Sequence, residues 1–392
     1  MRDVVVVSAV RTAVGKFGGT LKDYPSPKLM GLVVKEAIDR AGITPDMVED
    51  VIAGQCMQRM DETPMGRQAA LHAGCPISVP GVTIHRNCAS GMQSVIYAAQ
   101  QIMLGDMDIA IGGGAEVMSR VPYMLYETRW GKRLQHGTLV DGIWEGLTDP
   151  WCGLIMGLTA ENLAEKYDIS REEQDEVALR SHNNAERATK EGKFKEEILP
   201  VEIPQRKGDP IVFDKDEHFR PGLTADQLAK LKPSFKPDGT VTAGNASGIN
   251  DAAAALVLMS ADKAKELGIQ PIAKLRGHGL AGVEPELMGY GPVPATRQAL
   301  ERTGLKLEDM ELIELNEAFA AQYLSCEKLL GLNREITNVN GSGIGLGHPV
   351  GCTGARIIVS LLHEMKRRGN AMGLATLCVG GGMGQASIWE MC

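Results

Sequence analysis

The pattern of apolar and polar positions predicts a mixed α/β protein. The apolar run at 4–7 is typical of a strand buried on both faces. Residues 170–194 predict a helix, with Ser170 as its N-cap and Glu173 at the capping-box position. The segment 247–268 returns to a core-like composition. Because no apolar window approaches about 18 residues, the sequence predicts no membrane-spanning helix, and its first residues do not resemble a signal peptide.

The chain also repeats itself. Each half contains the end of an amphipathic helix, a glycine stop and an acidic segment, then a helix that begins near a cysteine, then a strand that ends in glycines. In this comparison Cys88 is set beside Cys352. The matching pairs occur in the same order and are 37–49 with 299–311, 88–106 with 352–370, and 110–116 with 378–384.

Duplicated strand–helix–strand units predict two mixed sheets with helices on both faces. We therefore expect a first half formed by residues 1–118 plus 249–270 and a second half formed by residues 271–392. The region between them, 119–248, is rich in charge, proline and tryptophan and has no counterpart in the second half. It is predicted to be an inserted loop domain that carries substrate-facing loops.

Composition narrows the classes of partner and site. Glycine is in excess, with 46 copies among 392 residues, or about 12% against a usual share of roughly 7%, which favours functional turns. The net charge of -8 argues against a nucleic acid as the main partner, although a local basic rim can still hold one phosphorylated ligand. The eight cysteines form no C-x-x-C pair, so neither a zinc site nor a disulfide framework is predicted, and free thiols fit the reducing cytosol.

Cys88 lies where a predicted strand, 82–86, passes into a long apolar helix. Free backbone N–H groups and the positive end of the helix dipole favour a thiolate at such a place. The same N–H groups can bind a developing oxyanion. Cys88 is therefore a candidate nucleophile, although a buried structural cysteine gives the same local pattern.

His348 lies in a glycine-rich loop within 338–357, directly before a predicted helix. The glycines allow the backbone to approach a ligand closely, and the proline that follows the histidine fixes the local chain. A histidine here can act as a general base toward a thiol, or it can be a turn residue bonded to the backbone. The glycines do not match a dinucleotide fingerprint, because Leu346 and His348 stand where its last glycine is required.

Two further polar positions stand at the ends of predicted strands. Cys378 ends an apolar run and precedes three glycines, a position typical of a site residue, although a core cysteine also fits. Asn316 separates a buried strand from a helix start, so it can either cap that helix or offer its amide to a site.

Taken together, these segments resemble the thiolase family over essentially the whole chain. The resemblance rests on many long motifs in the family's order. They are NCASGMQ around Cys88, GGGAEVMSR at 112–120, MGLTAEN at 156–162, VTAGNASGINDAAAA at 241–255, MGYGPVPA at 288–295, NEAFAAQ at 316–322, GSGIGLGHPVGCTGAR at 341–356 and CVGGGMG at 378–384. The fold that this resemblance implies is a duplicated pair of five-stranded mixed sheets in an α/β/α/β/α layering, with an inserted loop domain. In such a fold the inserted loop domain would carry coenzyme-binding and oligomer contacts.

The resemblance also implies roles for individual residues. Cys88 would be the acylated nucleophile, His348 its activator, and Cys378 the acid/base for the second substrate. Asn316 would help form one oxyanion hole, and the amides of Cys88 and Gly380 would form the other. The coenzyme would contact a further set of side chains, which are Ser247, Ala243, Phe235, Met288, Phe319 and Met156 along the pantetheine arm and Arg220 near the adenine.

The implied activity is the reversible cleavage of a 3-ketoacyl-CoA by CoA, or the condensation of two acetyl-CoA molecules. The reaction would pass through an acyl-Cys88 intermediate with ping-pong kinetics. Coenzyme A and its thioesters would be substrates rather than permanently bound cofactors, and neither a metal, a nucleic acid nor a membrane is expected to take part. The family further implies a cytoplasmic enzyme of fatty acid metabolism that forms a dimer or a dimer of dimers, that is, a homotetramer.

One departure from the family pattern concerns chain length. Thiolases specialised for acetoacetyl-CoA usually carry histidine just before the MG-x-x-AEN motif, whereas this chain has Ile155 there. An apolar side chain at that position would enlarge the acyl pocket or make its wall more hydrophobic. We therefore expect the enzyme to accept 3-ketoacyl-CoAs longer than four carbons.

Two alternatives share the fold. A 3-ketoacyl synthase typically pairs its cysteine with two histidines, or with histidine and asparagine, and needs no second cysteine. A non-catalytic lipid carrier would have lost one or more reactive residues. The joint presence of Asn316 and Cys378 favours a thiolase over a synthase. The carrier is disfavoured because all four key positions are filled, by Cys88, Asn316, His348 and Cys378.

Overall fold

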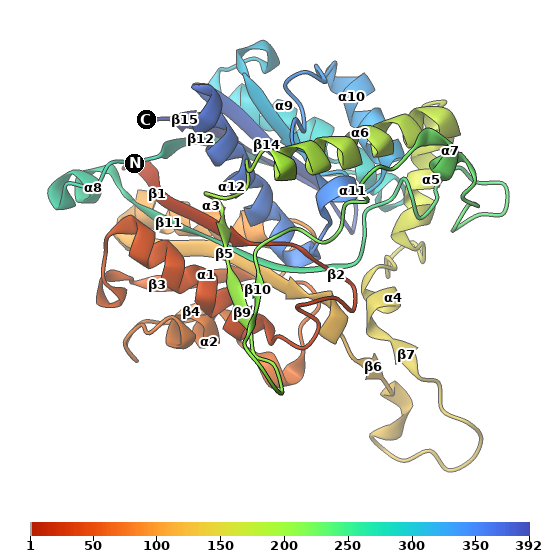
Figure 1. Cartoon of the computed structure of the whole chain (residues 1–392), viewed down its shortest axis with the longest axis horizontal. Helices are drawn as coiled ribbons and strands as arrows, with labels where there is room; N and C mark the ends of the chain where they lie inside the picture. Colours follow the sequence, from red (N-terminus) through yellow and green to blue (C-terminus); the bar gives the residue numbers. More distant parts are fainter. Residues whose placement is uncertain (1) are drawn as a thin grey trace.

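The computed structural model describes residues 2–392 and is built around one large mixed sheet (Figure 1). The strand order along this sheet is β13-β14-β15-β12-β1-β11-β5-β3-β4. The first-half strands are β1 (Val4–Thr12), β3 (Asp50–Gly54), β4 (Gly81–Ile84), β5 (Ile109–Val117) and β11 (Asn250–Ser260). The second-half strands are β12 (Ala273–Gly282), β13 (Leu312–Leu315), β14 (Met372–Val379) and β15 (Met383–Met391).

The two halves follow the same path, as the repeats predicted. The first half reads β4-β3-β5-β11-β1 and the second reads β13-β14-β15-β12, with Thr337 bridging Ile313 in the place that β4 takes beside β3. The halves are not separate sheets. β1 and β12 pair edge to edge through two residue pairs, Val5 with Lys274 and Val6 with Ala273, so the predicted pair of sheets is joined into one.

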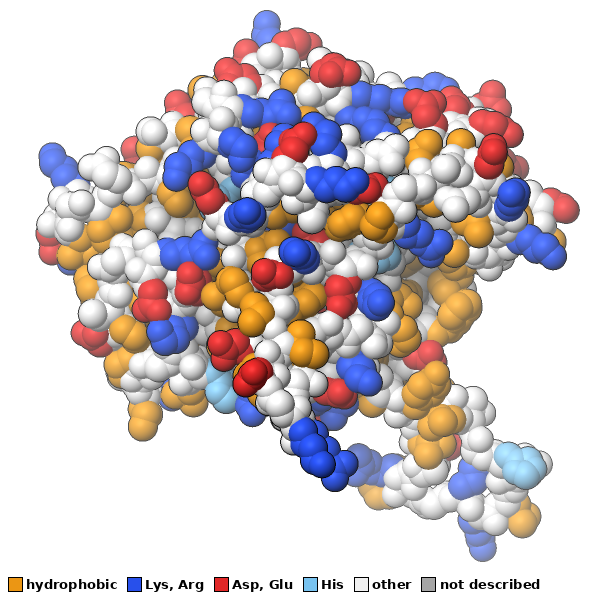
Figure 2. Space-filling view, viewed as in Figure 1, with side chains coloured by type: hydrophobic (Ala, Val, Ile, Leu, Met, Phe, Trp, Pro, Cys, Tyr) orange, Lys and Arg blue, Asp and Glu red, His pale blue; other side chains and the backbone are white. Residues whose placement is uncertain are grey.

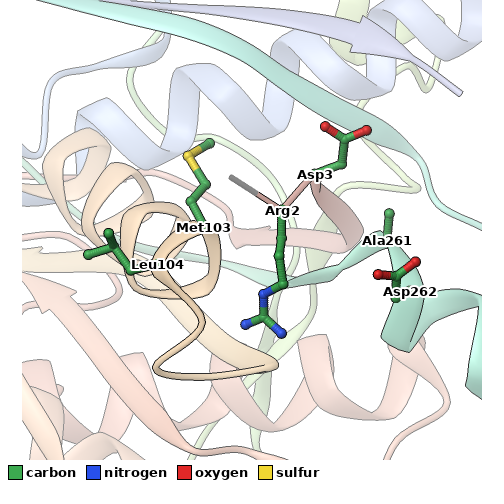
Figure 3. A pocket seen from close by; sticks show the side chains of 6 residues that line it. All are labelled: Arg2, Asp3, Met103, Leu104, Ala261 and Asp262. Carbon is green, nitrogen blue, oxygen red and sulfur yellow. The ribbon is translucent and has the colours of Figure 1, made fainter.

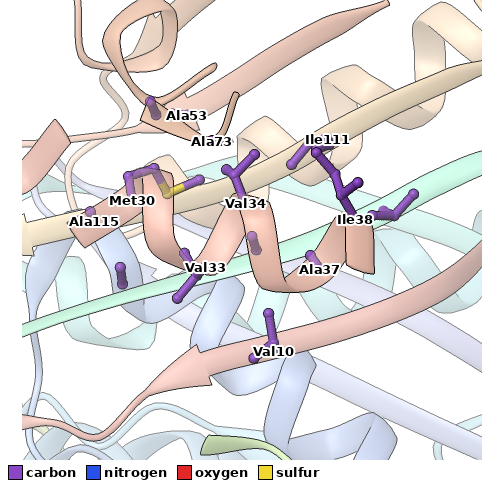
Figure 4. Packing of buried hydrophobic residues seen from close by; sticks show 14 of the residues in the cluster. Val10, Met30, Val33, Val34, Ala37, Ile38, Ala53, Ala73, Ile111 and Ala115 are labelled. Atoms are coloured by element: carbon purple, nitrogen blue, oxygen red, sulfur yellow. The ribbon is translucent and has the colours of Figure 1, made fainter. Parts of the chain in front are cut away.

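Helices cover the sheet in three layers. One outer layer holds α1 (Ser26–Ala41) and α2 (Met65–His72), the central layer holds α3 (Ser90–Leu104) and α12 (Val350–Arg368), and the other outer layer holds α9 (Pro292–Thr303) and α10 (Ala320–Leu330). The side chains of β11 alternate, so that Ala253 and Val257 face the α1 layer while Ala252 and Leu256 face the central layer. Figure 4 shows the apolar face of α1 packed over the strands.

The central helices α3 and α12 approach each other at glycines. A Cβ on Gly91 would lie 2.8 Å from the backbone N of Ala355, and one on Gly354 would lie 2.4 Å from the backbone N of Met92. These reciprocal contacts make Gly91 and Gly354 equivalent positions of the two halves. The pairing of Cys88 with Cys352 is therefore wrong by one residue.

Counted from the glycines, Cys352 is equivalent to Ala89, and Ser90 is equivalent to Thr353. Cys88 itself lies in the turn before α3, whereas Cys352 is fully buried inside α12. Sequence comparison alone chose the wrong register because a cysteine happens to stand near both helix starts.

The region between β5 and β11 forms short strands and helices around one end of the molecule. Its longest helix, α6 (Arg171–Lys190), begins with the predicted capping box of Ser170 and Glu173. The other elements of this region are β6 (Tyr123–Met124), β7 (Val140–Asp141), α4 (Gly142–Gly146), α5 (Met156–Lys166), β8 (Ile198–Leu199), β9 (Val201–Ile203), β10 (Ile211–Phe213) and α7 (Ala225–Ala229). Elsewhere, β2 (Gly15–Lys16) pairs with β11. Helix α8 (Ala261–Leu267) follows β11 in the chain, and α11 (Gly343–Leu346) precedes α12.

Residues 121–147, which we call the arm, project away from the body of the molecule (Figure 1). The space-filling view shows hydrophobic, basic and histidine side chains scattered over the arm (Figure 2). The division of the chain into two halves and an inserted loop domain, with the boundaries given above, stays a prediction. Among residues 2–392, no helix is both long enough and apolar enough to cross a membrane.

Candidate active site

A cavity of about 560 Å³ lies between the inserted region and the ends of α3 and α12. Cys88 from the first half and His348 from the second half both line it. Its walls are mostly apolar and come from the body, from α5 and from the arm, which contributes Ile143 and Trp144. Two candidate reactive groups that lie 260 positions apart in the sequence thus line one cavity.

Cys88 occupies a strand-to-helix turn, as predicted. The turn is closed by the bond from the Ala89 N–H to Arg86 O (3.0 Å), and the Ser90 hydroxyl accepts from the Arg86 N–H (2.9 Å) and donates to Asn87 O (2.7 Å). Asn87 has a φ of 42°, in the left-handed region that asparagine tolerates better than most residues. This backbone turn places Cys88 just ahead of the α3 N-terminus.

Burial, not the helix terminus, dominates the charge state of Cys88. Burial raises the pKa of the Cys88 thiol to about 11, although the N–H groups of Gly380 and of Cys88 itself act in the opposite direction. The expectation that the helix N-terminus favours a thiolate at rest is thus outweighed by desolvation. The resting group is a neutral thiol, and it needs a base to become a nucleophile.

His348 is held at two points. Its backbone N–H donates to Asn250 Oδ1 (2.9 Å), and its ring Nδ1 lies 2.7 Å from the Thr353 hydroxyl on α12. Burial, and secondarily the charge of Arg356, lowers the pKa of His348 to about 3. The imidazole is therefore neutral at physiological pH and able to accept a proton.

The backbone geometry before His348 requires glycine at position 347. Its φ is 105°, and a Cβ there would lie 2.6 Å from the side-chain carbon of Asn250. Only glycine gives both the conformation and the space that let Asn250 reach the His348 backbone.

Cys378 and Gly380 lie at the end of β14 and in the turn that follows it. Burial raises the pKa of the Cys378 thiol well above its ordinary value, and a negative charge on Cys88 would raise it further. Asn87 Nδ2 donates to Gly380 O (2.7 Å), which ties this turn to the Cys88 turn across the two halves. The two thiols are therefore electrostatically coupled, while the Gly380 N–H acts on the Cys88 sulfur.

Asn316 follows β13, and its side chain is fully buried. Phe319 rather than Asn316 stands at the N-cap of α10, so the capping alternative is wrong. Within residues 2–392, neither the Nδ2 nor the Oδ1 atom of Asn316 has a hydrogen-bond partner. A buried amide that the rest of the protein leaves unbonded is suited to a ligand atom.

All seven residues expected to contact the coenzyme line the same cavity as Cys88 and His348. Arg220 stands with His218 and Phe17 in an adjoining hollow, whereas Phe235 and Phe319 meet edge to face, with ring centroids 6.3 Å apart. The seven are Met156, Arg220, Phe235, Ala243, Ser247, Met288 and Phe319. Asn316, Cys378 and Gly380 do not line this cavity.

Sequence reasoning missed four residues that hold the site together. Asn87, Asn250 and Thr353 have the contacts given above. The fourth is Glu116, whose buried carboxylate accepts from the N–H groups of Cys56 (2.9 Å), Met57 (3.1 Å) and Gly351 (2.8 Å). Each of the four lies inside a motif quoted above, but only the fold shows which side chain or backbone group it meets.

A larger hollow of about 730 Å³ lies elsewhere, between Arg2 and Asp3, the end of α3 and the start of α8 (Figure 3). Its guanidinium group, on Arg2, is already bonded to Ile102 O (2.9 Å) and to Asp108 (2.6 Å). The Asp3 carboxylate is paired with Lys274. Since these charged groups are engaged with the protein, this hollow offers a ligand less than the cavity at Cys88.

Comparison with known proteins agrees with the site. The family model for the thiolase N-terminal domain matches residues 4–262, and the model for the thiolase C-terminal domain matches residues 269–391. The acetyl-CoA acetyltransferase of Cupriavidus necator is 52% identical over 391 residues, which cover 100% of both chains.

Two solved structures show the same fold. The crystal structure of the Bacillus anthracis acetyl-CoA acetyltransferase has 55% sequence identity and a TM-score of 0.99, and the match covers 100% of this chain and 99% of that one. The human mitochondrial 3-ketoacyl-CoA thiolase in complex with CoA has 42% identity and a TM-score of 0.96, with 100% and 98% covered. The predicted fold class is confirmed, and the chain is an acyltransferase that belongs to the thiolase family.

Proposed function

We propose that this chain catalyses the reversible thiolysis of 3-ketoacyl-CoA by CoA, and its reverse, the condensation of two acetyl-CoA molecules, through an acyl group carried on Cys88. One observation carries the proposal. Cys88 and His348, from opposite halves of the chain, line one cavity together with all seven side chains expected to hold the coenzyme. Acyl transfer needs a nucleophile, a base and a bound thioester close together, and this cavity would hold all three.

In the first half-reaction His348 takes the proton from the Cys88 thiol, and the sulfur attacks the 3-keto carbon. The resulting alkoxide collapses, the bond between carbons 2 and 3 breaks, and the electron pair leaves as the enolate of acetyl-CoA. Cys378 gives its proton to carbon 2, which completes the first product. In this scheme donors at Asn316 and at the Cys88 and Gly380 amides stabilise the two oxyanions.

In the second half-reaction free CoA gives its thiol proton to the Cys378 thiolate. The CoA sulfur then attacks the acyl carbon on Cys88, the thioester bond to Cys88 breaks, and acyl-CoA leaves. The Cys88 sulfur recovers its proton from His348. Each group returns to its starting state, so the scheme needs no permanently bound cofactor.

The electrostatics of the site support proton transfer that is coupled to attack. At rest Cys88 and His348 are both neutral, because burial raises the pKa of the thiol and lowers that of the imidazole. A separated thiolate and imidazolium would be unfavourable in this buried setting. Sulfur attack moves the negative charge onto the oxyanion, where backbone N–H groups can bind it, so the ion pair need not persist.

The nucleophile is tested by labelling with iodoacetamide, with and without acetyl-CoA. We expect Cys88 to be alkylated and acetyl-CoA to protect it, because an acetylated sulfur cannot react. The exposed Cys392 serves as an internal control that acetyl-CoA should not protect. Unprotected Cys88, or the absence of an acetyl group on its peptide after acid quenching, would refute the assignment.

We also propose that the enzyme accepts acyl chains longer than those of acetoacetyl-CoA. Ile155 lines the cavity beside Leu147, Ile143 and Trp144, so the wall at the expected histidine position is apolar. A series of 3-ketoacyl-CoAs from four to ten carbons, assayed with free CoA, tests this substrate range. Turnover confined to the four-carbon substrate would contradict it, and Ile155→His is expected to narrow the range toward that substrate.

A homo-oligomer, either a dimer or a dimer of dimers, is the proposed assembly. Among residues 2–392, strand β4 pairs on one side only, and its Val82 is 41% exposed; the arm presents Trp130 and Leu134 at 93% and 84% exposure. Free edges and exposed apolar side chains are typical of contact surfaces. Light scattering should give a multiple of the 42.1 kDa chain, and a monomer would contradict the proposal.

The proposed compartment is the cytoplasm, or another reducing one, because both Cys88 and Cys378 must be thiols in this scheme. Fractionation of cells that express the tagged chain checks this.

A further inference from the structure

Thr353 stands one turn into α12 and is fully buried. Its hydroxyl oxygen lies 2.7 Å from His348 Nδ1 and 3.0 Å from the carbonyl oxygen of Pro349. The hydroxyl therefore joins the ring of the candidate base to the backbone of its own loop. Neither the motifs nor the proposed scheme gives this residue a part.

The hydrogen balance of this contact follows from the chemistry of the groups. A hydroxyl carries one hydrogen, and the Pro349 oxygen can only accept. When His348 takes the Cys88 proton at Nε2, both ring nitrogens carry hydrogens, so Nδ1 must donate. Thr353 Oγ1 can accept that bond, because its own hydrogen has Pro349 O within reach.

We propose that Thr353 is the positioning residue for His348, whose hydroxyl accepts the Nδ1–H hydrogen bond, keeps Nε2 available to the cavity and supports the protonated ring during acylation of Cys88. The inference rests on the proposed function, since it assumes that His348 takes the Cys88 proton. The proton moves from Cys88 Sγ to His348 Nε2, and the sulfur electron pair forms the bond to the carbonyl carbon.

The repeated architecture supports this role independently. Ser90 is the equivalent of Thr353 in the first half, and its hydroxyl also turns back to the loop that carries a reactive side chain. Ser90 bonds only backbone groups, whereas Thr353 bonds the imidazole itself. A hydroxyl at this position of the duplicated unit thus bonds to the preceding loop in both halves. In the second half the hydroxyl also contacts the imidazole of His348.

Thr353 is the neighbour that can stabilise a protonated His348 ring, because the nearby charged group is a cation. Arg356, one turn further along α12, is the charged group that acts on His348, and a cation there opposes ring protonation. On the other ring edge, Nε2 has no hydrogen-bond partner among residues 2–392. Without the hydroxyl, the protonated ring would hold one buried N–H with no acceptor.

The test compares variants that keep or remove the hydroxyl. Thr353→Val removes it at nearly constant shape and should slow acetylation of Cys88 by acetyl-CoA about 10- to 100-fold at pH 7, the range expected for one buried donor left unbonded. Thr353→Ser keeps the hydroxyl and should stay within about threefold of the unchanged enzyme. Thr189→Val is the matched control, because Thr189 makes the same bond to the carbonyl four residues earlier (2.8 Å) but makes no hydrogen bond to a histidine within residues 2–392.

The pH profile separates positioning from packing. The loss in Thr353→Val should shrink as pH rises from 7 to 10, because hydroxide then ionises the thiol without the base, whereas a packing defect would slow acetylation equally at every pH. Thr353→Ala against Thr353→Ser repeats the comparison if the valine variant does not fold. A valine variant within twofold of the unchanged enzyme, or a serine variant as slow as valine, would overturn the inference.

His348→Asn separates the proposed role of His348 as base from the proposed role of Thr353 as its positioning residue. If this variant acetylates Cys88 at the normal rate, the proposed role of His348 fails, and the inference about Thr353 fails with it. If His348→Asn is slow while Thr353→Val is normal, only the inference about Thr353 is overturned.

Discussion

The loops at the starts of α3 and α12 occupy equivalent places in a duplicated unit, yet they differ in chemistry. The first loop gives a thiol directly ahead of its helix, held by backbone bonds through Ser90 and Asn87. The second gives an imidazole, held at the backbone by Asn250 and at the ring by Thr353. The duplicated unit thus provides the same backbone frame twice, and the two loops carry the proposed nucleophile and the proposed base.

The difference in burial is equally instructive. The Cys88 turn keeps partial exposure to the cavity, whereas His348 is nearly covered. Both groups are driven toward their neutral forms, one by a raised pKa and the other by a lowered pKa. A site of this kind gains its reactivity from partners arranged around the transition state rather than from a pre-formed ion pair.

The largest expected effect separates the two thiols. Cys88→Ser should lower thiolysis by more than about 10³-fold, because a serine hydroxyl is far from ionised and is a poor nucleophile at neutral pH. Cys378→Ser should lower thiolysis by about 10²- to 10⁴-fold, the usual contribution of a positioned acid/base, while Cys88 stays open to iodoacetamide. Steady-state assays and peptide mass spectrometry measure the two properties.

The exposed Cys392 supplies the control for this comparison, since Cys392→Ser should change neither property. If Cys378→Ser prevented alkylation of Cys88, the two thiols would not have the separate roles proposed for them. Near-normal thiolysis in Cys88→Ser would remove the nucleophile assignment altogether.

Much of this frame could be predicted from local pattern. The capping box at Ser170 and Glu173 needs only residues three apart, and the strand at 4–7 needs only an apolar run. The repeat order predicted the common path of the two halves. The edge pairing of Val5 and Val6 with β12 could not be predicted, because it joins segments that only the folded chain brings together.

At the site, too, the sequence could not predict contacts and burial that only the folded chain creates. Burial raises the pKa of Cys88, and burial is a property of the packed cavity rather than of the CASG motif. The Thr353 contact depends on the pitch of α12, which turns residue 353 back toward 348. The mistaken pairing of Cys88 with Cys352 arose because residue identity was matched where the Gly91 and Gly354 contact defines the register.

The pH dependence of Cys88 alkylation is a smaller effect. It tests the contrast between the raised pKa of Cys88 and the lowered pKa of His348. Since burial raises the thiol pKa from 9.0 to about 11, the thiolate fraction should rise about tenfold per pH unit through pH 10. Since the pKa of His348 is lowered to about 3, protonation of the ring should produce no inflection between pH 5 and 8. Alkylation rates measured with iodoacetamide from pH 5 to 10 test both statements.

Free N-acetylcysteine is the reference for that profile, and its rate should level off near the ordinary thiol pKa. A plateau for Cys88 below pH 9 would show that the Gly380 and Cys88 amides outweigh burial. An inflection near pH 6.5 would show that His348 titrates like an ordinary imidazole.

The smallest expected effect concerns the two equivalent hydroxyls. Ser90→Ala removes one acceptor for the Arg86 N–H and one donor to Asn87 O, so it should lower stability by about 1 kcal/mol. In a chain of this size that is a fall in Tm of roughly 1–2 °C, measured at fixed protein concentration. Ser94→Ala on the same helix is the matched control, because its hydroxyl only donates to Ser90 O (2.8 Å) and should cost less.

The slope of Cys88 alkylation against pH should not change in Ser90→Ala, because Ser90 bonds backbone rather than an ionisable ring. Thr353→Val should show the reverse behaviour, with acetylation slowed most at low pH and little loss of Tm. If Ser90→Ala altered the pH slope as Thr353→Val alters that of acetylation, the hydroxyls would act alike through loop packing. Ser90 and Thr353 would then have the same structural role, and Thr353 would not support the base.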